Sequence, residues 1–581
     1  MKYFILLVFP LQLFAQQSSS QTVQTEAQLL ELNKSVERDL KANDSHTYAI
    51  GLKTGEYLNA VVNQKGIDVT VLIIAPDNSK IAEINSPNGD KGEEPIGIDA
   101  KLSGTYRIEI SSPKTAVPPG RYEISVKEIL TPEANVRRLS EIKRKQEVVI
   151  NWVKDNSIQL KTVEAGNGFA DLQPLKKVLK DVHFVGLGEQ THGNSEFFKF
   201  KNRMLQFLVM EMGFRVFSIE SSLPSCRKIN DYVMGKTEDG AEALNSLRYW
   251  MWNTEEVKEM IDWIRAYNKN LPAKSKVKFV GFDFQNNHYG QERLTGYLNR
   301  TAPKQAEKYA ALLKADLGQL FEDIVDSSKQ KQATGTTALE NFRRQANDLF
   351  VFLDLNSPVL EARSNAEEHA EMLEFARVIV QNIDAYFSNG KGATGALRDM
   401  FMADNFRRIV SQEPAGTKFI LWAHNGHLST AENYGVFPPL GMHLRRFYGK
   451  DYYALGFCFN NGSFQARLAI PNMTMRSATS VSPLTKFTLG DARPGSVEWY
   501  LAQTKQKLFL VDFRTTQKSP EVKEWLSEQR PMRFIGTFFE ANGESARMAP
   551  TTVGKQYDGL FYIETTTRAH PNKSVVNVVQ E

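Results

Sequence analysis

The stretch Val182–Asn194, VHFVGLGEQTHGN, decides how the larger part of this chain should fold. Its first half is a mostly apolar run, and its second half places an acid, Glu189, three residues before an imidazole, His192. Continuous rather than alternating apolarity is typical of a strand that is covered on both faces, as in a parallel α/β sheet. The two polar residues would then follow the carboxyl end of a strand, where α/β proteins place their sites.

Six further segments of the same kind follow, separated by sequence with helical spacing, and this alternation predicts a mainly parallel α/β sheet. Between Asn299 and Ala393 there is almost no strand signal, so we expect a helical insertion or lid there, with a mobile loop at SSKQKQATGTT (327–337). The six predicted strands are RVFSIE (215–220), VKFVGFDF (277–284), KFILWAHN (418–425), YYALGFCF (452–459), KLFLVDF (507–513) and GLFYIET (559–565).

The first part of the chain has a different pattern. Over 28–130, short alternating segments such as DVTVLIIAP (68–76) are separated by turn groups, which predicts a β-sandwich. Helical spacing follows, so the α/β domain is expected over 136–581. The sandwich segment resembles the pre-peptidase C-terminal-type jelly roll found beside secreted bacterial hydrolases, which suggests contact with a surface or a glycan. We interpret Asp68, Asp90 and Asp99 as solvated loop acids rather than calcium ligands.

Length and charge are those of a folded protein with several domains. The 581 residues are too many for one ordinary core, and a net charge of +4 is too small to indicate a nucleic-acid partner. Residues 1–19 have the layout of a secretory signal peptide, with an apolar run too short to span a bilayer. We therefore expect an exported, periplasmic or extracellular protein without a membrane span. The two cysteines, Cys226 and Cys458, allow one long-range disulfide at most.

Ionisable residues follow four of the predicted strands, at the edge where parallel strands end. One histidine at a strand end is usually structural, but the repetition on four strands favours a catalytic cluster. A neutral His192 is a suitable general base, and a carboxylate from Glu189 or Glu220 can fix its tautomer and stabilise the imidazolium. In strand order, the candidates are Glu189 and His192, Glu220, Asp283, and His424 and His427.

Other residues near these strand ends have two interpretations each. GNSEFF (193–198) predicts a helix beginning at Asn194 or Ser195, whose free amides could hold an anion or a carbonyl oxygen. His288 is expected at the surface. Of Trp250 and Trp252, which are two residues apart, one is expected to line a substrate cleft. Three residues of one predicted helix could belong to the pocket or to a buried ion pair: Arg398, Asp399 and Asn405.

An ordered series of motifs resembles the erythromycin esterase family from about Leu139 to the end of the chain. The series is GLGEQTHGNSEFFKFKNRMLQFLVMEMGFRVFSIES, WMWNTEEVKEMIDWIR, GFDFQ, LRDMFMADN and WAHNGHLS. The resemblance implies an α/β core of the esterase and ChaN-like type with a helical insertion. It also implies hydrolysis of carboxylic esters or lactones, with macrolides as the family precedent, and no required metal or cofactor.

Carried over by motif, the resemblance implies that His192 activates water, that Glu189 and Glu220 assist it, and that His424 and His427 orient it and stabilise the oxyanion. There is one departure, because the family usually has Arg nine residues after that first histidine and this chain has Lys201. Lysine keeps the charge but lacks the bidentate fork. Substrate contacts are expected from Lys201, Arg203, Asp283, Arg398 and Trp252.

Two alternatives to a histidine-based esterase stay open. The same His and Glu residues could hold a metal ion that generates hydroxide, or the chain could be a secreted binding protein without turnover. The sequence has no GxSxG motif near a strand-to-helix turn, which argues against the common serine hydrolases. It also has no dinucleotide fingerprint and no phosphate-binding loop. The residue types do not select one ester or lactone as the substrate.

Overall fold

The structure is a computed structural model. It describes residues 27–86, 89–112, 119–317, 334–387, 393–432, 438–469, 482–540, 543, 547–575 and 578. The chain divides into two compact units, Met1–Arg144 and Lys145–Glu581. The predicted signal peptide, 1–19, and residues 327–333 of the predicted mobile loop lie outside the described residues. Within those described ranges, no helix is both long enough and apolar enough to cross a bilayer.

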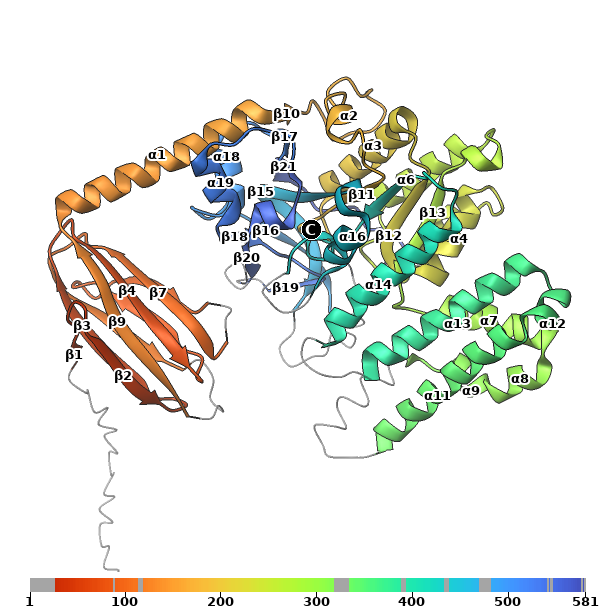
Figure 1. Cartoon of the computed structure of the whole chain (residues 1–581), viewed down its shortest axis with the longest axis horizontal. Coiled ribbons are helices and arrows are strands. Elements are labelled where there is room, and N and C mark those ends of the chain that lie inside the picture. Colours follow the sequence, from red (N-terminus) through yellow and green to blue (C-terminus); the bar gives the residue numbers. More distant parts are fainter. Residues whose placement is uncertain are drawn as a thin grey trace, which may run out of the picture. The chain divides into compact units, whose positions relative to one another are not determined.

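The first unit contains the predicted β-sandwich, in which two sheets stack on each other (Figure 1). Every second residue of β8 from Tyr106 to Ile110 is buried, as expected for a strand with one face toward the core. The sheets have the orders β1-β3-β8-β5-β6 and β2-β9-β4-β7. The strands are β1 (Gln28–Leu29), β2 (Ser35–Leu40), β3 (Ser45–Leu52), β4 (Tyr57–Lys65), β5 (Thr70–Ile74), β6 (Lys80–Ile84), β7 (Lys91–Asp99), β8 (Gly104–Ser111) and β9 (Gly120–Leu130).

The second unit is built on a sheet of order β10-β17-β21-β15-β11-β14-β12-β13. Neighbours from β21 to β13 are parallel, while β17 is antiparallel to β21 and β10 to β17. All seven apolar segments are strands, so the predicted α/β fold is confirmed. The strands are β10 (Ser157–Gln159), β11 (Phe184–Leu187), β12 (Val216–Ser222), β13 (Lys278–Asp283), β14 (Phe419–Trp422), β15 (Tyr452–Leu468), β16 (Leu484–Leu489), β17 (Leu508–Asp512), β18 (Arg530–Arg533), β19 (Phe538–Phe539), β20 (Met548–Thr551) and β21 (Gly559–Thr566).

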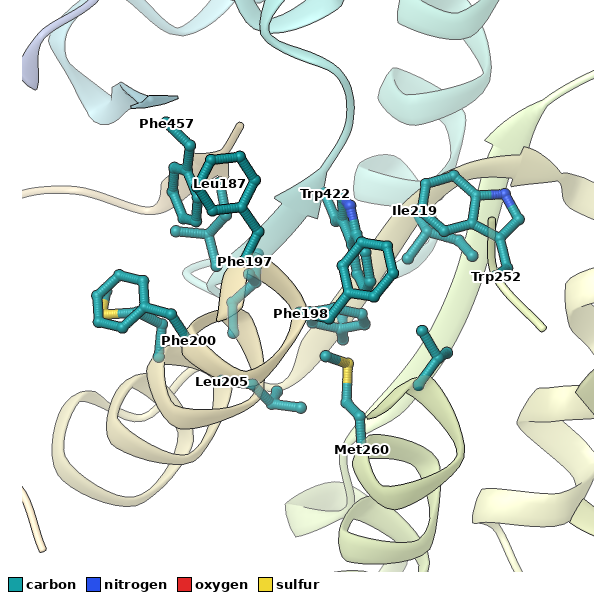
Figure 2. Packing of buried hydrophobic residues seen from close by; sticks show 14 of the residues in the cluster. Leu187, Phe197, Phe198, Phe200, Leu205, Ile219, Trp252, Met260, Trp422 and Phe457 are labelled. Carbon is teal, nitrogen blue, oxygen red and sulfur yellow. The ribbon is translucent and has the colours of Figure 1, made fainter. Parts of the chain in front are cut away.

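Helix α3 shows how the sheet is covered. Its residues Phe197, Phe198 and Phe200 are buried, and Figure 2 shows Phe198 beside Trp422 of β14, with ring centroids 5.0 Å apart. Gly213, at a φ of 78°, ends this helix. The other helices of this layer system are α2 (Leu175–Val178), α4 (Leu223–Val233), α5 (Gly240–Asn245), α6 (Glu255–Asn268), α14 (Ala393–Gln412), α15 (Asn425–Leu428), α16 (Leu440–Tyr448), α18 (Val497–Gln503), α19 (Pro520–Ser527) and α20 (Val553–Gln556), with α3 spanning Ser195–Met212.

All described secondary-structure elements between β13 and α14 are helices, and Figure 1 shows these helices grouped together. They enclose an apolar cluster of their own, which includes Leu298, Leu353 and Phe375. These helices are α7 (His288–Thr301), α8 (Pro303–Lys308), α9 (Ala310–Lys314), α11 (Thr334–Leu355), α12 (Ser357–Ala362) and α13 (Ala366–Phe387), and α1 (Pro132–Asn156) follows the sandwich.

The two cysteines do not pair. Cys226 lies in α4 and Cys458 in β15, and both thiols are buried and free. Burial raises the pKa of both thiols, so they behave as small apolar side chains. The long-range disulfide that the sequence allowed is not formed.

Candidate active site

The candidate catalytic residues lie at the carboxyl edge of four neighbouring strands, β11, β14, β12 and β13. The loop after β11 carries Glu189 and His192, Glu220 lies near the end of β12, and Asp283 ends β13. Histidines 424 and 427 follow β14 directly. Because neighbouring parallel strands end at one edge, residues more than two hundred positions apart meet there.

The loop that carries Glu189 and His192 is held by close backbone contacts. The carbonyl of Gly193 accepts hydrogen bonds from the amides of Gln465 (3.1 Å) and Ala569 (2.9 Å). A Cβ atom at Gly193 would overlap the carbonyl oxygen of Gln465. Glycine is therefore required here for the approach of β15, and this approach fixes the path of the loop.

Glu189 is fully buried and accepts three hydrogen bonds from side chains. Its Oε1 lies 2.6 Å from Nδ1 of His192, and its Oε2 accepts from Nε1 of Trp422 (2.6 Å) and from Nζ of Lys201. Burial alone would raise the pKa of Glu189, but Lys201 and His192 outweigh it and lower the pKa below its ordinary value. A carboxylate at this position keeps the proton of His192 on Nδ1, which leaves the lone pair on Nε2.

His192 lies where that lone pair can be used. Its side chain is 9% exposed, and Nε2 makes no hydrogen bond to any other residue of the described ranges. The imidazole packs against Trp252 and His424, with ring centroids 6.0 Å and 5.0 Å away. An oriented imidazole with one open nitrogen has the properties of a general base.

His424 has a different role, because both of its ring nitrogens are occupied. Nδ1 accepts from the amide of Gly426 (3.1 Å) at the start of α15, and Nε2 donates to the carbonyl of Ile535 (3.2 Å). Burial, with the nearby His192, lowers the pKa of His424 to about 3. Its backbone amide donates to Oε2 of Glu220 (2.9 Å). His424 is therefore a neutral residue that orients its neighbours, and it has no nitrogen left for a proton or a metal ion.

His427 is a cation that two carboxylates share. Its Nδ1 lies 2.8 Å from Oδ1 of Asp399, and its Nε2 lies 3.2 Å from Oε1 of Glu220. Burial acts to lower the pKa of His427, but the two carboxylates outweigh it and raise the pKa to about 10. Burial would likewise raise the pKa of Glu220, yet His427 and Arg398 hold it well below its usual value. The pair is thus an imidazolium and a carboxylate.

Arg398 completes this ion network. Its Nη2 donates to Oε1 of Glu220 (2.8 Å) and to Oδ2 of Asp283 (2.7 Å). Its Nη1 lies 3.0 Å from Nε2 of His427, a contact between two cationic donors that the shared carboxylate of Glu220 offsets. The side chains of Arg398 and His427 are 21% and 19% exposed. Two accessible cations of this kind are suited to stabilise an oxyanion.

Three of the predicted substrate contacts are buried side chains. Lys201 is fully buried and contacts Glu189, and Trp252 is only 2% exposed and packs against His192. Arg203 pairs instead with Asp171 (2.5 Å) and with the carbonyls of residues 162 and 168. The reason is helical geometry: two residues along α3 turn the side chain by about 200°, so Lys201 and Arg203 point to different faces.

The structure also places four further residues that were candidates in the sequence. The amide of Ser195, at the start of α3, donates to the carbonyl of Thr567 (2.9 Å), so this amide is not available for an anion. His288 is half-buried at the first position of α7. Trp250 is buried like Trp252, because residues 249–253 form turns rather than a helix. Asn405 donates to the carbonyl of Phe282 (3.1 Å), outside the cluster.

Two residues that organise the site have weaker signals in the sequence. Trp422 donates its indole N–H to Glu189, although an aromatic residue in an apolar strand normally indicates only a core position. Asp399 accepts from His427 and from the amide of Leu440 (2.7 Å), and so joins α14 to α16. What marks these two residues in the sequence is that each stands next to other candidates: Trp422 directly precedes AHNGH, and Asp399 directly follows Arg398.

A metal ion would need a set of ligands with open positions. Among the residues that the structure describes, no group of three or more His, Cys, Asp or Glu side chains is arranged to hold one. Both nitrogens of His424 are occupied, and His427 is protonated between two acids.

The fold and the cluster define an α/β protein with an acid–histidine site at the carboxyl edge of its sheet. A family model described as erythromycin esterase matches residues 209–566, and the chain belongs to the erythromycin esterase family. Members of this family are hydrolases, which agrees with the resemblance found in the sequence. The matched range contains the ion network of Glu220, Arg398 and His427, whereas Glu189 and His192 precede it.

Individual relatives extend this likeness toward the N-terminus. The erythromycin esterase type II of Escherichia coli is 25% identical over 441 residues, which are 72% of this chain and 97% of that protein. A putative hydrolase of Bacillus subtilis is 24% identical over 439 residues, 72% of this chain and 91% of its own. A solved structure of a Bacillus cereus protein covers 74% of this chain and 99% of its own, with 24% identity and a TM-score of 0.62. An erythromycin esterase mutant in its open conformation has the same fold, with 17% identity, a TM-score of 0.53, and coverage of 70% of this chain and 96% of its own.

Proposed function

We propose that the protein hydrolyses carboxylic esters or lactones, with water activated by His192. The observation that carries this proposal is the state of the imidazole: Glu189 holds Nδ1, and Nε2 stays open at the edge of the site. The relatives named erythromycin esterases support a macrolide-type lactone as the substrate class.

In the proposed reaction, Nε2 of His192 takes a proton from water while the water oxygen attacks the carbonyl carbon. The new oxyanion is stabilised by the cations Arg398 and His427, which Glu220 holds together. When the tetrahedral intermediate collapses, the carbon–oxygen bond to the alcohol breaks, and His192 returns its proton to the leaving alkoxide. A lactone is thereby opened to a hydroxy acid.

The test is an activity screen of the purified chain against a panel of esters and lactones that includes macrolides. Hydrolysis by the parent, with product mass increased by one water, supports the proposal when the His192→Gln variant loses it. A folded parent that hydrolyses none of these compounds would favour a binding protein instead.

Export is a further part of the proposal. Residues 1–19 have the layout of a signal peptide, and we infer cleavage near Ala15 or Gln16. The sandwich over 28–130 would then accompany the hydrolase outside the cytoplasm and contact a surface or a glycan. Sequencing the N-terminus of protein recovered from the periplasm or medium tests this, and recovery of an intact Met1 only in the cytoplasm would contradict it.

A further inference from the structure

We propose that Lys201 is the positioning residue of Glu189, that it acts only while its amine carries a proton, and that it thereby sets the alkaline limit of activity. This inference rests on the proposed hydrolysis, because it concerns the carboxylate that orients the catalytic base. It assigns to Lys201 a role beneath the site, without contact to substrate.

The surroundings of Lys201 leave it one ionic partner. The residue is fully buried, and its Nζ contacts Oε2 of Glu189, the carboxylate whose other oxygen meets His192. Three rings surround the ammonium: its Nζ lies 4.3 Å, 5.2 Å and 5.8 Å from the ring centroids of Trp422, Phe457 and Phe198. Ring faces attract a cation, but they do not replace its hydration. Glu189 is therefore the main reason for the amine to stay charged.

The charged groups around Lys201 come from two elements, and a third contributes a neutral ring. Glu189 on the loop after β11 and, more weakly, Glu220 on β12 favour the protonated amine, while burial opposes it and is the larger effect. The strand β14 contributes Trp422, which is uncharged. The balance lowers the pKa of Lys201 to about 8. An arginine in the same place would keep its charge across the whole range in which proteins stay folded.

Loss of this proton would disturb the base through Glu189. A buried carboxylate without a cation is unfavourable, so Glu189 would take up a proton from the solvent or turn away from His192. In both cases the imidazole loses the arrangement that keeps its lone pair on Nε2. We therefore expect the fraction of correctly oriented His192 to fall as Lys201 deprotonates.

The first experiment measures kcat/KM between pH 6 and pH 10 for the parent and for Lys201→Arg, on an ester that the parent hydrolyses. The parent should lose activity above about pH 8, by about tenfold for each pH unit, and Lys201→Arg should keep its activity to higher pH. Lys199→Arg is the matched control, because Lys199 lies on the same helix, is 30% exposed and pairs with Glu164 (2.9 Å). It should share the parent profile. Circular dichroism at each pH separates a change in rate from unfolding.

The second experiment needs no turnover and so separates this inference from the proposed function. NMR of the parent labelled with ¹³C at lysine Cε and ¹⁵N in histidine should show Lys201 titrating near pH 8, with His192 changing its Nδ1 signal over the same range. The missing signal in Lys201→Met or Lys201→Arg assigns the lysine, even where a variant is less stable. A Lys201 amine that stays protonated beyond pH 10, or a Nδ1 signal of His192 that does not follow it, would overturn the proposal. An alkaline limit shared by the parent and a folded Lys201→Arg would overturn it equally.

Discussion

The site contains two carboxylate–histidine pairs made of the same residue types, Glu189 with His192 and Glu220 with His427. The first histidine meets one carboxylate and keeps one nitrogen open, whereas the second lies between two carboxylates and uses both nitrogens. The first is therefore set up to accept a proton, and the second to remain a cation. The number of acids around an imidazole, more than its presence in a motif, decides its chemistry here.

The two pairs also differ in how exposed their accompanying cations are. Lys201 is fully buried under Glu189, while Arg398 is 21% exposed beside Glu220. A buried amine can act only on its carboxylate, but an exposed guanidinium can also meet a substrate oxygen. In the proposed mechanism, one half of the site transfers the proton and the other half stabilises charge.

Replacing the open histidine should have the largest effect. His192→Gln removes the proton acceptor, and we expect the turnover of the best ester substrate to fall by about 10²- to 10⁴-fold with the fold intact. Steady-state kinetics and circular dichroism measure the two effects. The matched control is His183→Gln at the opposite end of β11, which should keep the parent rate. A His192 variant with parent activity would remove the distinction between the pairs.

Replacing the carboxylate of the first pair should be the next most damaging change. Glu189→Gln leaves Lys201 buried without its counter-charge and no longer holds the tautomer of His192, so we expect a loss of about 10²-fold in kcat. Breaking a buried pair by removing one partner also costs about 3–5 kcal/mol of stability. Thermal unfolding should therefore show a lower Tm, and an unchanged Tm would contradict the burial of this pair.

The second pair, Glu220 with His427, should make the stability of the protein depend on pH. The folded pKa of His427 is about 10, above the value near 6.5 of an unfolded histidine, so its contribution is complete below about pH 6.5 and is lost as pH rises toward 10. The Tm difference between the parent and His427→Gln should be larger at pH 6 than at pH 9.5. A difference that is constant across this range would show that His427 is neutral in the folded protein.

Chelation should have the smallest effect. If His192 is the base, hydrolysis should stay within about twofold of its starting rate after prolonged treatment with EDTA, because a base of this kind needs no Lewis acid. The rate is measured after dialysis, with untreated enzyme as the control. Activity that disappears on chelation and returns with zinc or manganese would show that the histidines are metal ligands. The distinction between a proton-accepting pair and a cationic pair would then no longer hold.

The strands could be predicted because their apolar runs are continuous, and the strand-end residues followed from them. Segments such as KFILWAHN (418–425) combine both signals in eight residues. Parallel neighbours then bring such ends together, which is how Glu189, Glu220 and His424 could be grouped from sequence. Grouping these residues requires only the direction of the strands and the class of the sheet.

The direction and partners of side chains could not be predicted in the same way. Lys201 and Arg203 differ by two positions, and only the rotation of α3 against the sheet decides which one meets Glu189. The amide of Ser195 is occupied by a carbonyl of Thr567, which no local pattern indicates. These contacts depend on how segments that are far apart in the chain approach each other in space. A single sequence does not show how close such segments come.

The close approach of β15 to Gly193 also has a consequence for how this enzyme can change over generations. Every side chain larger than hydrogen at position 193 would collide with the backbone of Gln465, and backbone cannot move aside as a side chain can. All single-nucleotide replacements of this codon that change the residue therefore meet the same barrier. Laboratory evolution toward new esters should find its accepted substitutions in the helices around the site and leave this position untouched.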